Sequence, residues 1–441
     1  MYIEDLTIEN IKGFEKISIK FSDKKNPVKW ISLLGENGGG KSTVLQALGL
    51  LLAGPENVNK LLPVPNGWVR KEGNPGKLTI RIHQDEKDPG NYGEKKESKS
   101  FSYTYFITGS EKTNIRNKTY LEPTIVENPE RRLSWLKQNA LTSKGKGWFA
   151  AGYGAFRRLT RESRVIVPTL SSQERHNNFS TQFQDGEPLS SFEQWMVFLD
   201  YRIAKGENAS KKLAIQQRDI AVNAINSILP EGVKFDSVVE DGKIIFDVKG
   251  AKVSTINLSD GYRSILALMG DVIFRMLDQF PESKTPLEEK GIVLIDELDI
   301  HLHPVWQRSI AELLRKQFPN IQFVVATHSP MITAGAGPDS LTYRFVFDGS
   351  KTTVNEIKDL AFMSVDNILA SPAFSLVSPF SPQTQLQLEK YLRLKKKHKL
   401  SPVETKEYQA TLPFVEKAYA SLPEVNDLES RIDQFLKMKL P

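Results

Sequence analysis

The stretch GENGGGKS at residues 35–42 decides the fold of this chain of 441 residues. It fits the pattern G-x-x-x-x-G-K-[ST], in which successive backbone amides wrap a phosphate group. The apolar segment WISLLG at 30–35 precedes it, and a helical pattern runs from Ser42 to about Leu52. A strand, a glycine-rich loop and a helix in this order favour phosphate binding, because a helix amino terminus attracts anions. A glycine-rich turn with a chance lysine is the alternative, and it does not account for the flanking strand and helix.

Two side chains of this loop have specific expected roles. Lys41 is expected to reach the β and γ phosphates of a nucleotide and to act in catalysis, and Ser42 to hold Mg²⁺. We therefore expect ATP and Mg²⁺ to bind here. The expected nucleotide-binding residues of the loop are Gly35, Glu36, Asn37, Gly38, Gly39, Gly40, Lys41, Ser42 and Thr43.

Two further apolar segments end in polar side chains, GIVLIDE at 291–297 and IQFVVATHS at 321–329. Segments of this kind, followed by helices, are typical of a parallel sheet that is covered on both faces. Ligands of such sheets lie at the carboxyl ends of the strands. The predicted fold class is therefore α/β with a mainly parallel core sheet, and three strand ends are predicted to meet at one site.

The polar residues at these strand ends suggest hydrolysis. Asp296 and Glu297 are adjacent carboxylates after an apolar run, which is costly unless a metal pairs with them. We expect Asp296 to hold Mg²⁺ through water and Glu297 to act as the general base. An N-cap pair for the next helix is the alternative. His328 is expected to contact the γ-phosphate and hold the water, although a lone histidine is often structural.

The composition excludes several other kinds of protein. The chain has no cysteine, which excludes a disulfide scaffold, a cysteine-ligated zinc site and a thiol nucleophile. The net charge of +6 only weakly favours a nucleic-acid partner. No apolar stretch reaches membrane-spanning length, and the opening MYIEDLTIENIKGF does not resemble a signal peptide. We expect a cytoplasmic protein without a membrane partner.

Outside the predicted site, periodicity predicts further elements. Alternation over 3–21 predicts a β-hairpin, and 76–126 is predicted to be β-rich around a mobile polar loop at 83–100. Residues 189–228 are predicted to be helical, and 233–250 to form a hairpin that turns at Asp241 and Gly242. Residues 382–440 are predicted to be helical, with a capping box in the sequence SPVE at 401–404.

The stretch LSDGYRS at 258–264 is similar to the signature loop of the ABC-type ATPases, which is usually LSGGQ. Ser259 and Gly261 match that loop, whereas Asp260 and Tyr262 differ from it. The resemblance implies a head-to-tail dimer, in which each ATP lies between one P-loop and the opposite signature. It therefore adds Ser259 and Gly261 to the expected ATP-binding residues. A plain N-cap of the next helix is the alternative.

Two more motifs narrow the resemblance. The stretch DELDIHLHPVWQ at 296–307 and the opening pattern I-x-x-I-x-N-x-K-G-F resemble the ATPases of the OLD, RecF and SMC group. Asp299 stands where glutamate is commoner in that group. The Q-loop glutamine of these ATPases has Gln173 and Gln182 as candidates, and GYGAFRRL at 152–159 is the other candidate segment. An equally good interpretation of this segment is a strand-to-helix turn at Tyr153 and Gly154, with Arg157 and Arg158 on a solvated basic face.

The resemblance also implies a domain order and a function. The chain has neither a long coiled coil nor, after His328, an Asp-x-Asp pair for a nuclease. It most resembles the PtuA family of Septu anti-phage ATPases, whose partner PtuB is an HNH nuclease. An ATPase of the PARIS defence systems, a RecF-like repair ATPase that binds DNA and a scaffold that rarely hydrolyses ATP are the alternatives. The predicted domains are an ATPase head in two parts, 1–188 and 231–375, an antiparallel β subdomain within its first part, a helical insertion at 189–230 and a helical partner region at 382–441.

The expected partners are a second copy of the chain, a separate nuclease, and DNA through the complex. An apolar stripe of Leu388, Tyr391 and Leu392, followed by the basic run KKKH at 395–398, suggests the partner surface. A helix packed within the chain, with a solvated basic end, is an equally good interpretation.

Overall fold

The chain forms two compact units, Met1–Val365 and Asp366–Pro441. The computed structural model describes residues 1–23, 26–86, 88, 99–115, 118–142, 148–157, 174–184, 189, 191–239, 242–376, 378, 380–397 and 399–420. Several predictions fall outside these residues: most of the polar loop, the roles of Arg158 and Gln173, the turn residue Asp241, the basic His398, and the tail after residue 420.

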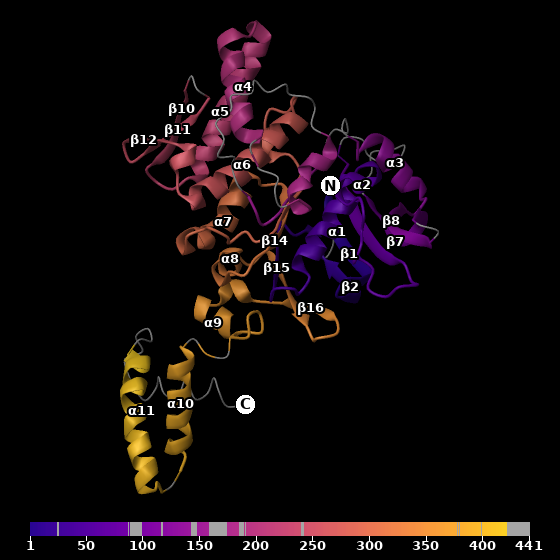
Figure 1. Cartoon of the computed structure of the whole chain (residues 1–441). Helices are drawn as coiled ribbons and strands as arrows, with labels where there is room; N and C mark the ends of the chain where they lie inside the picture. Colours follow the sequence, from indigo (N-terminus) through magenta and orange to yellow (C-terminus); the bar gives the residue numbers. More distant parts are fainter. Residues whose placement is uncertain are drawn as a thin grey trace. The chain divides into compact units, whose positions relative to one another are not determined.

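A six-stranded sheet forms the centre of the first unit (Figure 1). All of its neighbouring strands are parallel except for the β15–β16 pair. The mainly parallel core sheet is therefore confirmed. We had expected further short strands up to about residue 357, which include β15, whereas the parallel strand β9 at the edge of the sheet was not predicted. In spatial order the strands are β16 (Thr352–Ile357), β15 (Ser340–Phe347), β5 (Trp30–Gly35), β14 (Ile321–Ala326), β13 (Gly291–Ile295) and β9 (Phe149–Tyr153).

Both faces of this sheet are buried, as the continuous apolar strands predict. On one face, Val293 and Ile295 of β13 join a core with helices α4 (Ser191–Lys205), α5 (Asn208–Ile228), α6 and α7. On the other face, Ile292 and Leu294 of the same strand join a core with α1 and the antiparallel sheet. The helices that cover the sheet include α1 (Lys41–Ala53), α6 (Asp260–Gln279), α7 (Pro304–Gln317) and the short α8 (Pro330–Gly335).

The predicted antiparallel β subdomain is also present. It has the strand order β2-β1-β6-β7-β8 and lies beside helices α2 (Pro55–Leu61) and α3 (Arg131–Asn139). The side chain of Gln322 on β14 bonds to both main-chain groups of Ile3, which ties this subdomain to the central sheet. Its strands are β1 (Tyr2–Ile11), β2 (Phe14–Lys20), β6 (Gly76–Gln84), β7 (Lys99–Ile115) and β8 (Lys118–Glu127), and a small pair, β3 (Ser22–Asp23) and β4 (Asn26–Pro27), follows β2.

The predicted helical segment forms two helices, α4 (Ser191–Lys205) and α5 (Asn208–Ile228), which lie side by side in Figure 1. Both pack on α6. The hairpin that follows has the predicted strands β10 (Val233–Val238) and β11 (Ile244–Val248). A third strand, β12 (Ala251–Ser254), was missed because it is short and has little alternation.

The second unit contains an antiparallel helical pair, α10 (Pro382–Lys395) and α11 (Pro402–Ala420), after the short α9 (Val365–Ala370) at the junction. The rings of Tyr391 and Tyr408 stack across the pair, 5.2 Å apart. The predicted capping box is present, because Glu404 Oε2 accepts from the Ser401 amide and Ser401 Oγ from the Glu404 amide. The apolar stripe of α10 therefore packs on α11, and its use as a free partner surface was the wrong interpretation.

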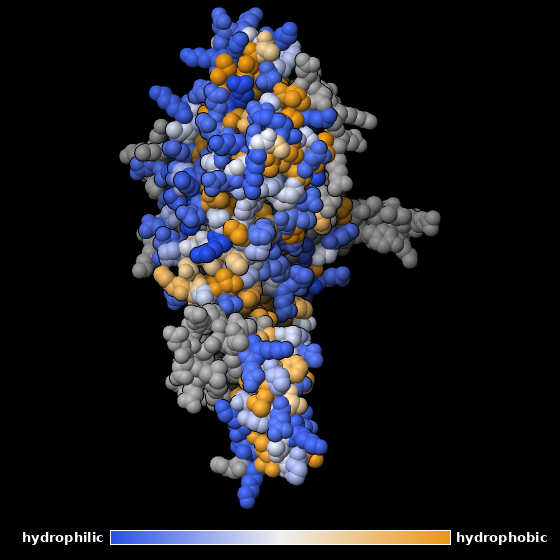
Figure 2. Space-filling view, turned by 90° about the vertical axis from the view of Figure 1, so that its left-hand side faces the viewer, coloured by the Kyte–Doolittle hydropathy of each residue, from blue (hydrophilic) through white to orange (hydrophobic). Residues whose placement is uncertain are grey.

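Figure 2 shows hydrophilic residues over most of one face, with hydrophobic residues interspersed. Within the described ranges, no helix combines the length and apolar character that a membrane span needs.

Candidate functional site

The glycine-rich loop curls at the end of β5 and leads directly into α1. Gly38 and Gly40 have φ angles of 79° and 96°, which side chains rarely allow. A Cβ atom at Gly40 would also lie 2.4 Å from the ring of Phe14, at the tip of the β1–β2 hairpin. The conformation of this loop therefore requires glycine at both positions, and at Gly40 the ring of Phe14 also leaves no room for a side chain.

Lys41 folds back over the loop. Its ammonium donates to the carbonyl oxygens of Gly35 at 2.8 Å and Glu36 at 3.1 Å. Burial lowers the pKa of Lys41, and the nearby carboxylates of Asp296, Glu297 and Asp299 oppose that shift. A polyanionic ligand at the loop would stabilise the charged ammonium further.

Asp296 lies at the end of β13, opposite the start of α1. The Ser42 side chain hydrogen-bonds to its carboxyl group, so the two predicted metal residues meet from separate elements. Burial raises the pKa of Asp296, although the Ser42 hydrogen bond and the charges of Arg157 and Lys41 oppose the shift. Its Oδ1 atom is buried and has no hydrogen-bond partner among the described residues. Two oxygen ligands side by side suit Mg²⁺.

The segment after Asp296 bends sharply and binds to the end of β14. Glu297 has a φ angle of 47°, in the left-handed region. The amide of Leu298 donates to the carbonyl of Ala326 at 3.1 Å. Asp299 Oδ1 accepts from the amide of His328 at 3.1 Å and from the hydroxyl of Thr327. The structure therefore holds Glu297 and His328 at neighbouring strand ends.

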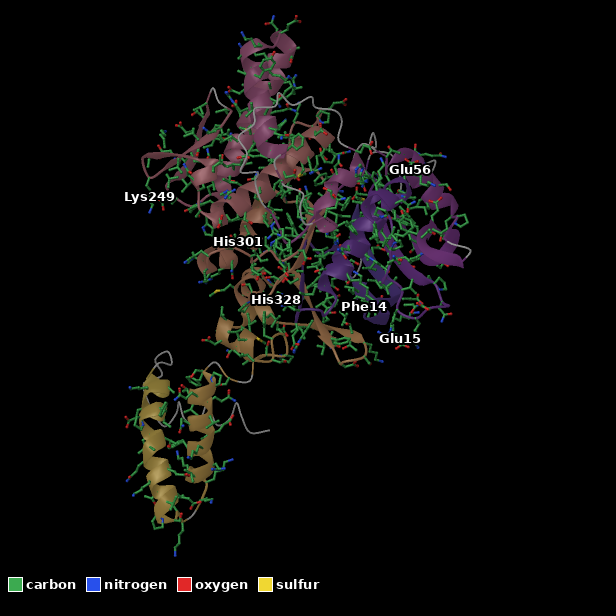
Figure 3. All side chains as sticks on the ribbon, in the orientation of Figure 1. Phe14, Glu15, Glu56, Lys249, His301 and His328 are labelled. Carbon is green, nitrogen blue, oxygen red and sulfur yellow. The ribbon has the colours of Figure 1, made fainter. Side chains whose placement is uncertain are left out.

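His328 has an unused nitrogen. Its Nε2 atom is buried and lacks a hydrogen-bond partner in the described part of the chain, like Oδ1 of Asp296. Buried polar groups are normally satisfied, so an orphan atom needs an explanation. Figure 3 shows where His328 lies in the first unit. A bound nucleotide with its metal ion would supply partners for both atoms.

The predicted signature residues begin helix α6. Ser259 is the exposed N-cap residue, and its side chain makes no capping bond. A Cβ atom at Gly261 would lie 2.7 Å from the carbonyl oxygen of His301, in the segment after β13 (Figure 3). The next residue, Tyr262, packs its ring edge-on against Trp306, 5.1 Å away. The start of α6 is thus exposed at Ser259, and the assignment of Ser259 and Gly261 as signature residues stays a prediction.

Arg157 is the site residue whose role sequence reasoning missed. A solvated basic face was the wrong interpretation for it, because only 4% of its surface is exposed. Its guanidinium donates to the carbonyl oxygens of Gly154, Asp296 and Glu297. The one sequence signal was an arginine soon after the apolar segment FAAGY at 149–153, and a contact to a strand 139 residues away leaves no local pattern.

Gln182, a Q-loop candidate, lies between two glycines instead. A Cβ atom at Gly152 of β9 or at Gly49 of α1 would lie within 2.5 Å of its side-chain oxygen. The carbonyl of Gln182 accepts from Gln46 of α1 at 2.9 Å. No hydrogen bond between described residues joins its side chain to Ser42 or Asp296. Its assignment as the Q-loop residue stays a prediction.

Comparisons with known proteins show sequence similarity to a Septu protein and a retron ATPase. The chain is 27% identical over 336 residues to the Septu protein PtuA of Bacillus mycoides (strain KBAB4), a match covering 76% of this chain and 39% of that protein. It is 24% identical over 372 residues to the Retron Vc95 probable ATPase of Vibrio cholerae serotype O1 biovar El Tor, covering 75% of this chain and 71% of that protein. The chain thus spans well under half the length of the Bacillus mycoides protein.

A solved SMC head bound to the C-winged helix domain of ScpA aligns with a TM-score of 0.49 and 15% identity, covering 82% of this chain and 100% of that one. The model of the family described as "AAA domain, putative AbiEii toxin, Type IV TA system" matches residues 31–334. That range includes the glycine-rich loop, the predicted signature residues and the strand ends with Asp296 and His328. The chain therefore belongs to this family of AAA ATPase domains.

Proposed function

We propose that the chain hydrolyses ATP at sites shared between two copies of itself, and that this cycle gates a separate nuclease in a defence complex. The observation that carries the hydrolytic part is the pair of buried, unpaired atoms among the described residues, Oδ1 of Asp296 and Nε2 of His328, together with the charge of Asp296 close to Lys41. Lys41 and the loop amides bind the phosphates. A magnesium ion, held by Ser42 and by Asp296 through water, would neutralise phosphate charge.

Glu297 and His328 divide the remaining chemistry. Glu297 accepts the proton of the attacking water as general base. His328 hydrogen-bonds to the γ-phosphate through Nε2. This nitrogen is buried and has no hydrogen-bond partner among the described residues. The hydrogen bond between Asp299 and the His328 amide keeps these two strand ends in register.

The shared site rests on Ser259. It is exposed at a helix amino terminus, and its side chain makes no capping bond in its own chain. Such a helix end binds phosphate well. A second copy would place this helix end on the γ-phosphate of the first.

Mixing two inactive variants tests the shared site. Ser259→Arg should bind ATP but not hydrolyse it, whereas Lys41→Ala should not bind ATP. Their mixture should recover part of the activity, because each mixed dimer has one intact site. Ser259→Ala is the matched control, since it removes the hydroxyl without adding bulk and should retain part of the activity. A mixture that associates but stays inactive would exclude the shared site.

The defence role is supported by the names of the relatives, a Septu protein and a retron ATPase. The nuclease in trans, of HNH type, is our proposal. A plasmid-cleavage assay on the complex with a nuclease encoded beside this chain tests it. Millimolar ATP should restrain cleavage, and ATP depletion should release it. Cleavage that ignores nucleotide would refute gating, and ATP-dependent binding of duplex DNA by this chain alone would favour a repair function.

A further inference from the structure

The guanidinium of Arg157 holds the backbone of the two residues on which hydrolysis depends. It donates to the carbonyl oxygen of Asp296 and, at 2.8 Å, to that of Glu297. A third bond at 2.9 Å goes to the carbonyl of Gly154, in its own segment. One planar fork therefore joins the loop after β9 to the turn after β13.

This turn needs an external support. Glu297 has a φ angle of 47°, which costs a non-glycine residue free energy. The amide of Asp296 is already fixed by the carbonyl of Tyr153 at 2.8 Å, so the strand itself is held. The peptide groups beyond it carry the side chain of Glu297, and Arg157 is the side chain that binds their carbonyl oxygens.

Burying the charged side chain of Arg157 has a large desolvation cost. It is buried, and burial lowers its pKa to about 10 despite the carboxylates of Asp296, Asp299 and Glu297 nearby. Its Nε atom has no hydrogen-bond partner within the described residues. A neutral amide side chain would have a lower desolvation cost, but it carries its two N–H donors on a single nitrogen, whereas the rigid guanidinium binds three carbonyls from two separate nitrogens.

We propose that Arg157 is a positioning residue, whose two-carbonyl grip sets the direction of the Glu297 carboxylate toward the attacking water. It acts through Glu297 and contacts neither water nor phosphate. The inference rests on the proposed ATP hydrolysis and adds to it a residue to which the sequence analysis assigned no catalytic role. A lysine at this position keeps the charge but loses the planar fork, so the backbone carbonyls are no longer held together.

Kinetics with a double-variant cycle tests this role. Arg157→Lys should lower kcat by about 10- to 100-fold, the usual effect of a residue that orients a catalytic group. ATP affinity should stay within about threefold, since the loop is untouched. In the Glu297→Gln background the same substitution should lower kcat by less than threefold, because the carboxylate that Arg157 orients is already absent. Losses that multiply in the double variant, or a loss of ATP binding instead of kcat, would overturn the proposal.

Arg175→Lys provides a matched control. Arg175 is equally buried, its Nε donates to the carbonyl of Leu52 at 3.0 Å, and burial lowers its pKa to about 10 as well. It contacts no residue of the turn after β13 by any hydrogen bond among the described residues. Its replacement should reduce stability without changing kcat of the folded protein. A fall in kcat equal to that of Arg157→Lys would reduce Arg157 to a general packing role.

Hydrogen exchange gives a readout that needs no turnover. At a temperature where both variants are folded, Arg157→Lys should speed exchange at least tenfold in the peptide covering 296–300, and Arg175→Lys should not. Unchanged exchange there would overturn the proposal even in an active enzyme. A wild-type complex without any ATPase activity would instead refute the proposed function, and the exchange result would still decide the role of Arg157.

Discussion

One carboxylate oxygen of Asp299 accepts the main-chain amide of His328 at 3.1 Å. The hydroxyl of Thr327 donates to the same oxygen. Asp299 follows the predicted base by two positions, and His328 lies two residues after the end of β14, so this single atom connects two parts of the proposed hydrolytic site.

Replacing Asp299 should therefore affect stability and activity together. In Asp299→Ala, the Thr327 hydroxyl and the His328 amide lose their acceptor, at a cost of about 1–3 kcal/mol in the free energy of unfolding. The ATPase rate should fall as His328 loses its position. Asp299→Asn keeps an acceptor oxygen and should lose less of both. Urea unfolding and steady-state ATPase assays measure the two effects, and equal stability of all three proteins would contradict the contact.

Two glycines of the loop should respond differently to alanine. Both have positive φ angles, so each substitution carries a backbone cost of roughly 1–2 kcal/mol. Only at Gly40 would the new Cβ meet a side chain, the ring of Phe14 at 2.4 Å, whereas Gly38 has no atom within 4 Å. Gly40→Ala should weaken ATP binding more than Gly38→Ala, as measured by titration calorimetry. Adding Phe14→Leu should restore part of the ATP affinity in the Gly40→Ala variant but not in the Gly38→Ala variant.

Because the pKa of Asp296 is raised, replacing its carboxyl group should increase the stability of the protein at neutral pH and decrease its activity. Because the folded state favours the neutral acid, this group stabilises the fold below its ordinary pKa of 3.8, and that contribution is lost as the pH rises through the folded value. Asp296→Asn should thus raise the melting temperature at pH 7 without nucleotide, with a difference that shrinks below about pH 4. Its turnover should fall roughly 10- to 100-fold. A lower melting temperature at pH 7 would contradict the direction of the shift.

Asp271 on helix α6 should be critical to folding. It is fully buried, and its Oδ2 atom accepts from the hydroxyl of Tyr153 at 2.8 Å and from Nε of Arg275. Asp271→Ala leaves a buried charge without its partner and should cost about 3–5 kcal/mol. Tyr153→Phe removes one hydrogen bond only and should cost about 1–3 kcal/mol. Denaturant titrations rank the two, and the reverse order would show that Arg275 finds another partner.

The helical pair of the second unit should be separable from nucleotide binding. Its core of Leu388, Tyr391, Leu394, Val415 and Ala418 is its own cluster. Deleting 382–441 should leave ATP affinity within about threefold, yet disrupt higher assembly or nuclease docking and with it protection against phage. Leu388→Lys, which places a charge inside the pair, is the point-variant counterpart. Light scattering and a phage-plating assay measure both, and full protection by the deletion would exclude this region from the complex.

Local patterns predicted the loop, the two buried strand ends and the order of elements, because each follows from residues that are neighbours in sequence. Strand β9 was not predicted, because its sequence FAAGY contains a glycine and two alanines and lacks the strong apolar pattern of GIVLI. Contacts between distant segments were out of reach for the same reason. Nothing near Arg157 in the sequence indicates that it binds Asp296, and nothing near Asp299 indicates that it binds His328.

The order of strands also affects how this chain is made. Strand β5, which leads into the nucleotide loop, pairs with β14 and β15, and both are translated about 300 residues after it. At roughly 5–20 residues per second, its apolar backbone waits on the order of 15–60 s for either neighbour. During that time the nascent chain exposes the unpaired segment WISLL, which is a good binding site for a chaperone. The part of the protein that should bind ATP is among the last to become native during synthesis.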